Sequence, residues 1–342
     1  MNNEKDLKKG NLIPSSKHDI EKYSSDLINR GLELVKIFKK EEKDKLWPVR
    51  IEGKYGYINK MGKIVIEPRF DDAHWFREGL GVVNITGNQG YIDTTGEMVI
   101  RPQFGEAHQF SEGFACVKID NKYGFIDRKG NIVIKPRFEE QSFFKEGLAC
   151  IKIKGEYGFI DSMGRMVIKP QSEWANHFYE GLACVKVKDK YGFIDKMGKM
   201  VITPQFEGAI AFSEGLAWIR VAGKYGFIDM AGRIVIKPQF DLVSPFYEGL
   251  ASIGINNKYG FIDKTGKIAI KLQFDLAVFF KEGLAPIRVS GKWGCIDKTG
   301  KIIIRPQFDS IGPFRGGMAY VEVAGKSGYI DKQGNYVWKP TS

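Results

Sequence analysis

The chain has 342 residues, which is enough for one long repeat array or for two ordinary domains. Its hydrophobic content of 43% is that of a folded protein, and its formal net charge is +11. No apolar run approaches the length of a membrane span, and the first residues, MNNEKDLKKGNLIP, lack the apolar core of a signal peptide. Four cysteines in a chain of this length do not form a disulfide framework. We therefore expect a cytoplasmic protein that does not bind a membrane.

The first predicted element lies in residues 16–43, where apolar side chains recur at helical spacing. Ser16 followed by Asp19 resembles a capping box. The apolar positions are Ile20, Tyr23, Leu27, Ile28, Leu32, Val35 and Phe38. We predict that residues 1–43 form an amphipathic helical cap that covers the open edge of the segment that follows.

From residue 44 to residue 340 the sequence repeats about nine times, with a period of 34 residues and no insertion or deletion. Glycine columns mark the period, and a proline column from Pro68 to Pro340 is interrupted only at Leu272. A fixed period in this range is typical of architectures in which each unit buries its apolar face against its neighbours. The most regular glycine column is Gly56, Gly90, Gly124, Gly158, Gly192, Gly226, Gly260, Gly294 and Gly328.

Residues 112–145 show the first two elements of one unit. In FACVKI (114–119) apolar residues alternate with others, which predicts a half-buried strand. Asp120 and Asn121 follow, and both residue types tolerate the positive φ of a tight hairpin turn. The next segment, KYGFID, should therefore return antiparallel, and Gly124 should allow a neighbouring backbone or ring to come close.

A second turn and a third strand complete the unit. Asp127 and Gly130 in DRKG suit a hairpin turn, so we interpret the recurring aspartate as a structural residue and not as a calcium ligand. Residues 132–134, Ile-Val-Ile, are apolar on both faces and predict a strand buried on both sides. Pro136 should end that strand. A long connection with recurring phenylalanines follows, so each unit is predicted to be a three-stranded antiparallel meander with an anchored loop.

The repeats also resemble a known family. GLACVKVKDKYGFIDKMGKMVITPQF (181–206) and KWGCIDKTGKIIIRPQFDSIGPF (292–314) look like the WG repeat, also called the KWG repeat, of bacterial tandem-repeat proteins. The namesake tryptophan survives only at Trp293, and tyrosine replaces it in most units. The resemblance implies an all-β repeat array over residues 44–340 with no shared catalytic activity, and it supports binding or scaffolding.

Two architectures fit nine such units. One is an open superhelical β solenoid, and the alternative is a closed ring of blades, as in propellers. Propeller blades usually contain four strands and about 40 or more residues, whereas each unit here has 34 residues and three clear strands. A closed ring also needs no helical cap. These features favour the open solenoid, whose last edge, at YVWKPTS, either closes onto the first unit or is offered to a partner.

No residues form a convincing catalytic or metal-binding constellation, and we expect neither an enzyme nor a cofactor. His74 and His108 occupy the same repeat position, but ligands at suitable spacing do not accompany them. The cysteines at Cys116, Cys150 and Cys184 share one column, which we interpret as a semi-exposed slot for small residues. The glutamate column from Glu78 to Glu282 recurs too regularly to be a single active site.

The positive charge is spread over the repeats, with +2 in residues 1–43 and +9 in the remainder. Regular columns of lysine and arginine can form a stripe that matches nucleic acid or another polyanion. Acidic columns run beside them and weaken that interpretation. The columns are Lys118, Lys152, Lys186, Arg220 and Arg288, and Arg101, Lys135, Lys169, Lys237, Lys271 and Arg305.

Function is best sought where the units differ, because a constant frame with variable exposed residues is how repeat proteins recognise partners. Tryptophan, tyrosine and arginine dominate binding hot spots. We therefore predict a non-catalytic scaffold that binds a protein partner, with nucleic-acid or other polyanion binding as the alternative and no small-molecule substrate. The candidate binding surface is Trp75, Phe143, His177, Tyr179, Trp218, Arg220, Tyr247, Phe279, Arg315 and Tyr320.

Overall fold

The computed structural model describes residues 45–341, and the repeats form one compact unit, Leu46–Ser342. All of its described elements are strands, and none of residues 45–341 belongs to a helix long and apolar enough to cross a membrane. The helical cap predicted for residues 1–43 lies outside the described residues and stays a prediction.

The strands form nine separate sheets, which we call blades 1 to 9 in chain order. Blade 1 has three strands and each of the other eight has four. The first long strands are β1 (Trp47–Ile51), β5 (Leu80–Ile85), β9 (Ala115–Ile119), β13 (Leu148–Ile153), β17 (Leu182–Val187), β21 (Leu216–Val221), β25 (Leu250–Ile255), β29 (Leu284–Val289) and β33 (Met318–Val323). The second are β2 (Lys54–Ile58), β6 (Asn88–Asp93), β10 (Lys122–Ile126), β14 (Glu156–Ile160), β18 (Lys190–Asp195), β22 (Lys224–Asp229), β26 (Lys258–Asp263), β30 (Lys292–Asp297) and β34 (Lys326–Asp331).

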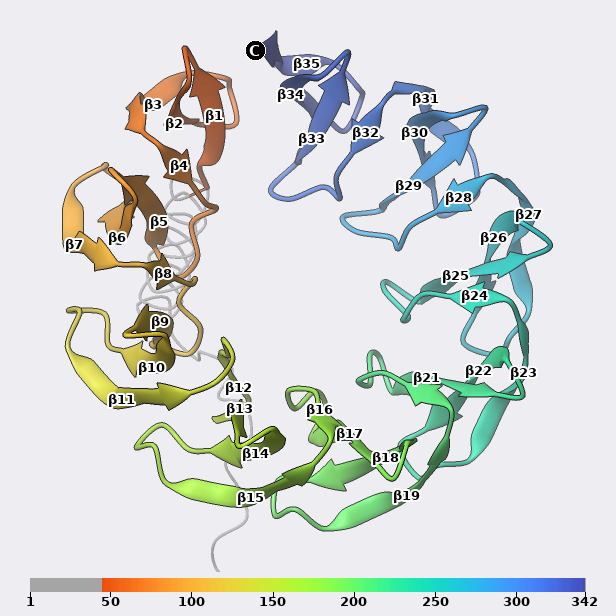
Figure 1. The fold of residues 1–342 in the computed structure, drawn as a ribbon. Helices are drawn as coiled ribbons and strands as arrows, with labels where there is room; N and C mark the ends of the chain where they lie inside the picture. Colours follow the sequence, from red (N-terminus) through yellow and green to blue (C-terminus); the bar gives the residue numbers. More distant parts are fainter. Residues whose placement is uncertain (1–44, 342) are drawn as a thin grey trace, which may run out of the picture. The chain divides into compact units, whose positions relative to one another are not determined.

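The third long strands are β3 (Ile64–Phe70), β7 (Met98–Phe104), β11 (Ile132–Phe138), β15 (Met166–Ser172), β19 (Met200–Phe206), β23 (Ile234–Phe240), β27 (Ile268–Phe274), β31 (Ile302–Phe308) and β35 (Tyr336–Thr341). The short strands are β4 (Asp72–Ala73), β8 (Glu106–Ala107), β12 (Phe144–Lys145), β16 (Trp174–Ala175), β20 (Gly208–Ala209), β24 (Leu242–Val243), β28 (Leu276–Ala277) and β32 (Ser310–Ile311). Each short strand pairs antiparallel with the first long strand of its blade, so a four-stranded blade runs short, first, second, third. The blades form a ring with the short strands on its inner side and the third strands outside (Figure 1).

The two turns within a blade form as predicted. Asp120 and Asn121 have φ of 48° and 60°, the left-handed values of a tight hairpin between β9 and β10. In the second turn one Asp263 carboxylate oxygen accepts hydrogen bonds from the backbone N–H groups of Thr265 and Lys267, at 2.9 and 3.1 Å. The aspartate column therefore serves the backbone of the hairpin, once in every repeat from Asp93 to Asp331, with Asn59 in the same role in blade 1.

The prediction that Pro136 ends the third strand is wrong, because β11 continues through it to Phe138. The pairing between β10 and β11 shifts register across this stretch, and such a bulge on an outer strand accommodates a residue without an N–H donor. Gly124 lies opposite the bulge, and a Cβ there would come within 2.5 Å of the Ile134 carbonyl oxygen. The predicted close approach of a backbone at this glycine column is confirmed.

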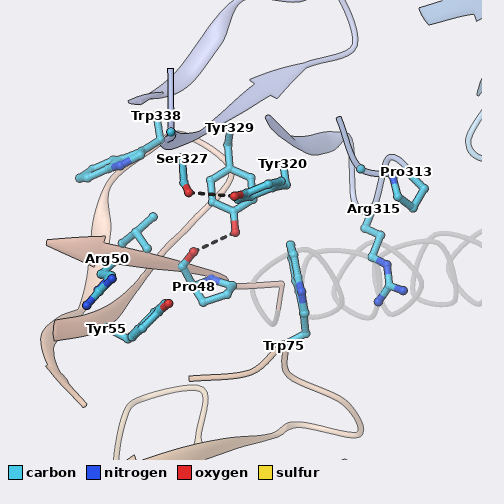
Figure 2. A pocket seen from close by; sticks show the side chains of 13 residues that line it. Pro48, Arg50, Tyr55, Trp75, Pro313, Arg315, Tyr320, Ser327, Tyr329 and Trp338 are labelled. Atoms are coloured by element: carbon cyan, nitrogen blue, oxygen red, sulfur yellow. Dashed lines mark hydrogen bonds between the residues drawn. The ribbon is translucent and has the colours of Figure 1, made fainter. Parts of the chain in front are cut away.

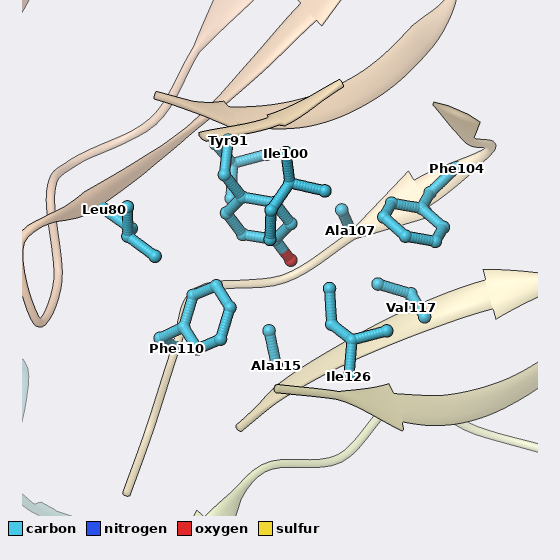
Figure 3. Close-up of a cluster of buried hydrophobic side chains, with 10 residues drawn as sticks. Leu80, Tyr91, Ile100, Phe104, Ala107, Phe110, Ala115, Val117 and Ile126 are labelled. Atoms are coloured by element: carbon cyan, nitrogen blue, oxygen red, sulfur yellow. The ribbon is translucent and has the colours of Figure 1, made fainter. Parts of the chain in front are cut away.

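The cores lie between blades and not within them. In Figure 3, Leu80, Tyr91 and Ile100 of blade 2 face Phe110 and Ile126 of blade 3, and all five are buried. The Tyr91 and Phe110 rings meet edge to face with centroids 4.9 Å apart. Similar ring pairs recur at six further boundaries between blades, at 4.8 to 4.9 Å. Every blade therefore buries both faces of its inner strands against two neighbours.

Two predictions about burial are wrong, because each blade is packed between two neighbouring blades. The first strand was expected to be half-buried, but Cys116 is only 1% exposed, because a second blade covers the face it occupies. The cysteine column is thus core and not a semi-exposed slot. The third strand was expected to be buried on both sides, yet Ile132 and Val133 are 50% and 41% exposed, because β11 is the outermost strand of its blade. Of the three apolar residues only Ile134 is buried.

The ring closes between blade 9 and blade 1, and the predicted open solenoid is therefore wrong. Trp47 and Val49 of β1 are buried in one cluster with Met318 and Tyr329 of blade 9. The Tyr329 hydroxyl donates a hydrogen bond to the Pro48 carbonyl oxygen at 2.8 Å. The closed ring was the alternative interpretation. A unit of 34 residues is long enough for it, because the fourth strand has only two residues and comes from the connection that was expected to be a loop.

The glutamate column joins consecutive blades. The Glu146 carboxylate accepts hydrogen bonds from the backbone N–H groups of Glu180 and Gly181 in the next blade, at 2.7 and 3.0 Å. The same bonds link Glu78 to Glu112 and Gly113, and Glu282 to Gly316 and Gly317. The column is therefore structural, in agreement with its regular recurrence.

Candidate functional site

The inner side of the ring is formed by the connections that precede the first strands, and these connections carry the variable columns. In blade 2 the His74 N–H donates to the Val82 carbonyl oxygen at 2.9 Å. Arg77 and Leu80 exchange backbone hydrogen bonds of 2.9 and 3.1 Å. These hydrogen bonds fix the backbone at both ends of the connection, and therefore they also fix the positions from which the side chains of Trp75 and Arg77 extend. The same bonds recur in most other blades.

Most of the predicted binding residues meet in pairs that join different blades of this inner side. The rings of Phe143 and His177 stack with centroids 3.6 Å apart and an interplanar angle of 14°. Tyr247 and Phe279 lie at 4.6 Å. Two cations lie over rings, with the Arg315 guanidinium 5.9 Å from the Trp75 centroid and the Lys145 ammonium 5.4 Å from that of Tyr179.

Tyr179 shows that the inner side also brings distant blades together. Burial raises the pKa of its hydroxyl, Tyr247 of blade 7 raises it further, and the positive charge of Arg77 in blade 2 lowers it. Tyr179 itself belongs to blade 5, so it interacts electrostatically with residues two and three blades away. These variable positions of blades 2, 5 and 7 therefore face a common space on the inner side of the ring.

A pocket of about 500 Å³ lies where blade 9 meets blade 1, and we call it the seam pocket. Figure 2 shows three predicted residues in its wall, Trp75, Arg315 and Tyr320. The Tyr320 hydroxyl and Ser327 Oγ are 2.8 Å apart, and the Tyr329 and Trp75 rings meet edge to face at 6.1 Å. The pocket thus combines aromatic walls with a guanidinium group.

Two lining residues of the seam pocket, Tyr55 and Tyr329, were not predicted as site residues. Both belong to regular aromatic columns, and regularity indicated a core role. No sequence signal distinguishes them, because only ring closure places the first and last repeats side by side. Closure also supplies Trp75 with its partner Tyr329, 254 positions away in the sequence.

Trp218 and Arg220 lie apart from the paired inner residues. Trp218 is half-buried and packs against Tyr225, with ring centroids 5.2 Å apart, in the space left by the missing side chain of Gly208. Arg220 is exposed, and its guanidinium lies 5.7 Å from the Tyr225 centroid. The structure therefore gives Trp218 a packing role, and whether either residue binds a partner stays a prediction.

The lysine and arginine columns differ in their surroundings. Lys118 and Lys152 of the inner column are 2.6 Å from the carboxylates of Glu106 and Glu140, so much of their charge is neutralised. The outer column, represented by Lys135, is exposed on the third strands. Its members lie on the outermost strands, which run around the perimeter of the ring (Figure 1), and so they do not form one straight stripe.

Among residues 45–341 no group of three or more His, Cys, Asp or Glu side chains is arranged to hold a metal ion. Burial raises the pKa of the Cys116, Cys150, Cys184 and Cys295 thiols to about 12, which keeps them in the unreactive thiol form.

A closed ring of small antiparallel sheets defines the β-propeller class, here with nine blades. The chain belongs to the WG containing repeat family, whose model matches eight tandem segments, 55–88, 90–123, 123–157, 157–191, 191–225, 225–259, 259–293 and 293–326. The expected family is thereby confirmed. No curated protein is significantly similar in sequence.

Solved structures agree with the fold. A eukaryotic initiation factor matches with a TM-score of 0.63 at 11% identity, covering 86% of this chain and 95% of that one. The dihydro-heme d1 dehydrogenase NirN matches with a TM-score of 0.48 at 12% identity, covering 77% and 73%. Hsv2p of Kluyveromyces lactis matches with a TM-score of 0.42 at 8% identity, covering 66% and 91%. At these identities the first likeness shows a shared fold alone, and the other two carry no argument.

Proposed function

We propose that this β-propeller is a non-catalytic scaffold that binds a protein partner through the inner side of the ring. The observation that carries the proposal is the seam pocket, in which Trp75, Tyr320 and Tyr329 surround a space of about 500 Å³ beside Arg315. Aromatic residues and arginine in a preformed concave surface are the usual anchors of binding interfaces.

Charge indicates what the partner presents. Arg77, Lys145, Lys281 and Arg315 occupy one column of the inner side, and none of the four forms an ion pair within residues 45–341. A partner segment with aspartate or glutamate residues would complement this column, steer the encounter and offset the cost of desolvating the cations. The polyanion alternative draws less support, because the inner lysines are neutralised and the outer ones are dispersed.

The test compares matched arginine variants in affinity capture followed by cross-linking. Arg315→Gln removes a seam-pocket cation, and Arg101→Gln removes an exposed cation of the outer column, so the net charge changes equally. We expect the wild type and Arg101→Gln to retain the same partner, whereas Arg315→Gln and Trp75→Leu lose it by about tenfold or more. Cross-links should map to an acidic segment of the partner.

Equal capture by all four proteins would contradict the proposal, as would a partner that cross-links only to the outer strands. Thermal unfolding of each variant provides the control for folding. All three substituted side chains are at least partly exposed, so we expect small changes in stability, within about 1 kcal/mol.

A further inference from the structure

A second pocket, of about 410 Å³, lies on the inner side of blades 2 to 5 and is separate from the seam pocket. We call it the histidine pocket, because His74, His108 and His177 all line it. Arg77 of blade 2 and Gln109 of blade 3 contribute further polar groups. Four consecutive repeats thus each supply polar side chains to this pocket, with Gln141 and Ser142 coming from blade 4.

The lining of this pocket carries positive charge and no negative charge. Arg77 is its one permanently charged side chain, and no carboxylate belongs to the wall. Two acidic groups close to the lining residues, Asp72 and Glu106, already have partners. Asp72 lies 3.5 Å from His74 Nε2, and Glu106 accepts hydrogen bonds of 2.6 Å from Lys118 Nζ and the Tyr123 hydroxyl.

Hydrogen-bonding groups of the pocket remain available. His108 Nε2 is shielded from solvent and has no hydrogen-bond partner within the described residues, which is costly unless a ligand or water satisfies it. Gln109 uses one amide N–H on the Trp75 carbonyl oxygen at 3.2 Å and retains the other. Burial is the main cause of the lowered pKa of His108, and the nearby His74 lowers that pKa further. The two histidines therefore interact electrostatically.

His177 forms a rigid wall of the pocket. Its Nε2 accepts from the Phe143 backbone N–H at 3.4 Å and lies 3.3 Å from Ser142 Oγ, and its ring stacks on that of Phe143. Because Nε2 is an acceptor, the neutral ring carries its hydrogen on Nδ1. Val82 and Ala107 are buried and complete an apolar side.

We propose that the histidine pocket binds a small organic anion, with its carboxylate or phosphate oxygens held by Arg77 and by N–H groups of His74, His108 and Gln109. An arginine fork matches both kinds of oxyanion. The volume is that of pockets for small organic molecules, and the apolar side accommodates the carbon skeleton of such a ligand. The anion is a ligand of the scaffold and not a substrate, since the proposal includes no chemical step.

The test is isothermal titration of the full chain at pH 7 and constant ionic strength, with inorganic phosphate and malonate as separate probes. We expect at least one probe to bind the wild type. Arg77→Gln should weaken that binding about tenfold or more, and His108→Asn should weaken it as well. The matched control is Lys281→Gln, which removes a cation at the same repeat position in blade 8, outside the pocket, and should change affinity less than about twofold.

Phosphate binding more tightly than malonate would assign the site to phosphate esters, and the reverse order would assign it to carboxylates. Three results would overturn the proposal: no binding of either probe, equal weakening by Arg77→Gln and Lys281→Gln, or unchanged affinity in both pocket variants. Equal weakening would mean that the inner side attracts anions only through its general charge. Thermal unfolding of every variant ensures that a loss of binding is not a loss of fold.

Discussion

At the scale of single residues, His177 is held in a neutral form by its surroundings. Its ring stacks on Phe143, and the Phe143 backbone N–H donates to its Nε2. Burial lowers the pKa of His177 to about 4. An unfolded chain has no such environment, and there the imidazole titrates near its ordinary value of about 6.5.

This difference in the pKa of His177 between the folded and unfolded states predicts that the free energy of unfolding depends on pH. Between about pH 6.5 and pH 4 the unfolded state binds more protons at His177 than the folded state, so acidification lowers the free energy of unfolding. The contribution is complete above pH 6.5 and amounts to at most about 3 kcal/mol. His177→Gln, which installs the residue found at Gln109, should lose less stability over this range. Urea unfolding at pH 7, 5.5 and 4.5 measures the difference, and parallel curves would contradict it.

At the scale of elements, neighbouring blades are joined by buried apolar surfaces and by the glutamate column. The Glu146 carboxylate accepts from two N–H groups of the next blade and lies 3.1 Å from Lys196 Nζ. Burial tends to raise the pKa of this carboxyl, but the bonds from Lys196 and the two backbone N–H groups outweigh it and hold the pKa below its ordinary value. The charged carboxylate is therefore the form that links the blades.

Replacing this carboxylate should weaken the boundary between blades. Glu146→Gln retains one acceptor oxygen and places an amide N–H₂ against donors, so we expect a loss of about 1–2 kcal/mol in the free energy of unfolding. Glu156→Gln, at an exposed position in the second strand of the same repeat, is the matched control and should change stability by less than about 0.5 kcal/mol. Equal effects in urea unfolding would show that the column does not couple the blades.

At the scale of the whole unit, closure makes the boundary between blades 9 and 1 equivalent to an internal one. Met318 is 2% exposed, and it occupies the repeat position of Leu284, which is 6% exposed between blades 8 and 9. Gly62 of blade 1 lies so near blade 9 that a Cβ would be 2.4 Å from the Val337 carbonyl oxygen. Blades 9 and 1 are thus in close contact at the core of the seam, beside the seam pocket.

Closure predicts similar costs for two truncations. Met318→Ala and Leu284→Ala should each lower the free energy of unfolding by about 2–5 kcal/mol, because each leaves a cavity in a buried cluster. In an open array Met318 would lie on a free edge, and its truncation would cost less than about 1 kcal/mol. Urea unfolding of both variants distinguishes the two cases, with Leu284→Ala as the internal reference.

Much of the blade was predictable, because its elements depend on residues close together in the sequence. The turns at Asp120–Asn121 and at Asp263 follow from local backbone chemistry. The third strand was less predictable. The exposure of Val133 and the passage of β11 through Pro136 depend on its position at the outer edge of the ring, where no strand follows.

Part of the candidate site was also predictable. Variation between repeats identified Trp75, His177 and Arg315 as surface residues of interest, and the structure places all three on the inner side. Variation did not identify Trp218 as a packing residue, because the space it fills is created by Gly208 in another element. Variation between repeats also did not identify Tyr329, because the residues at the same repeat position in other blades belong to the hydrophobic core.

The sequence by itself determined the period, the strands and turns of each repeat, and the family, because these depend on local chemistry and on the spacing of recurring residues. Only the tertiary structure decided that the ring closes, since the packing of Trp47 against Met318 joins residues 271 positions apart. A repeat of 34 residues is compatible with either form. The angle between neighbouring blades, summed over nine of them, decides whether the ends meet, and with that it decides where the pockets lie.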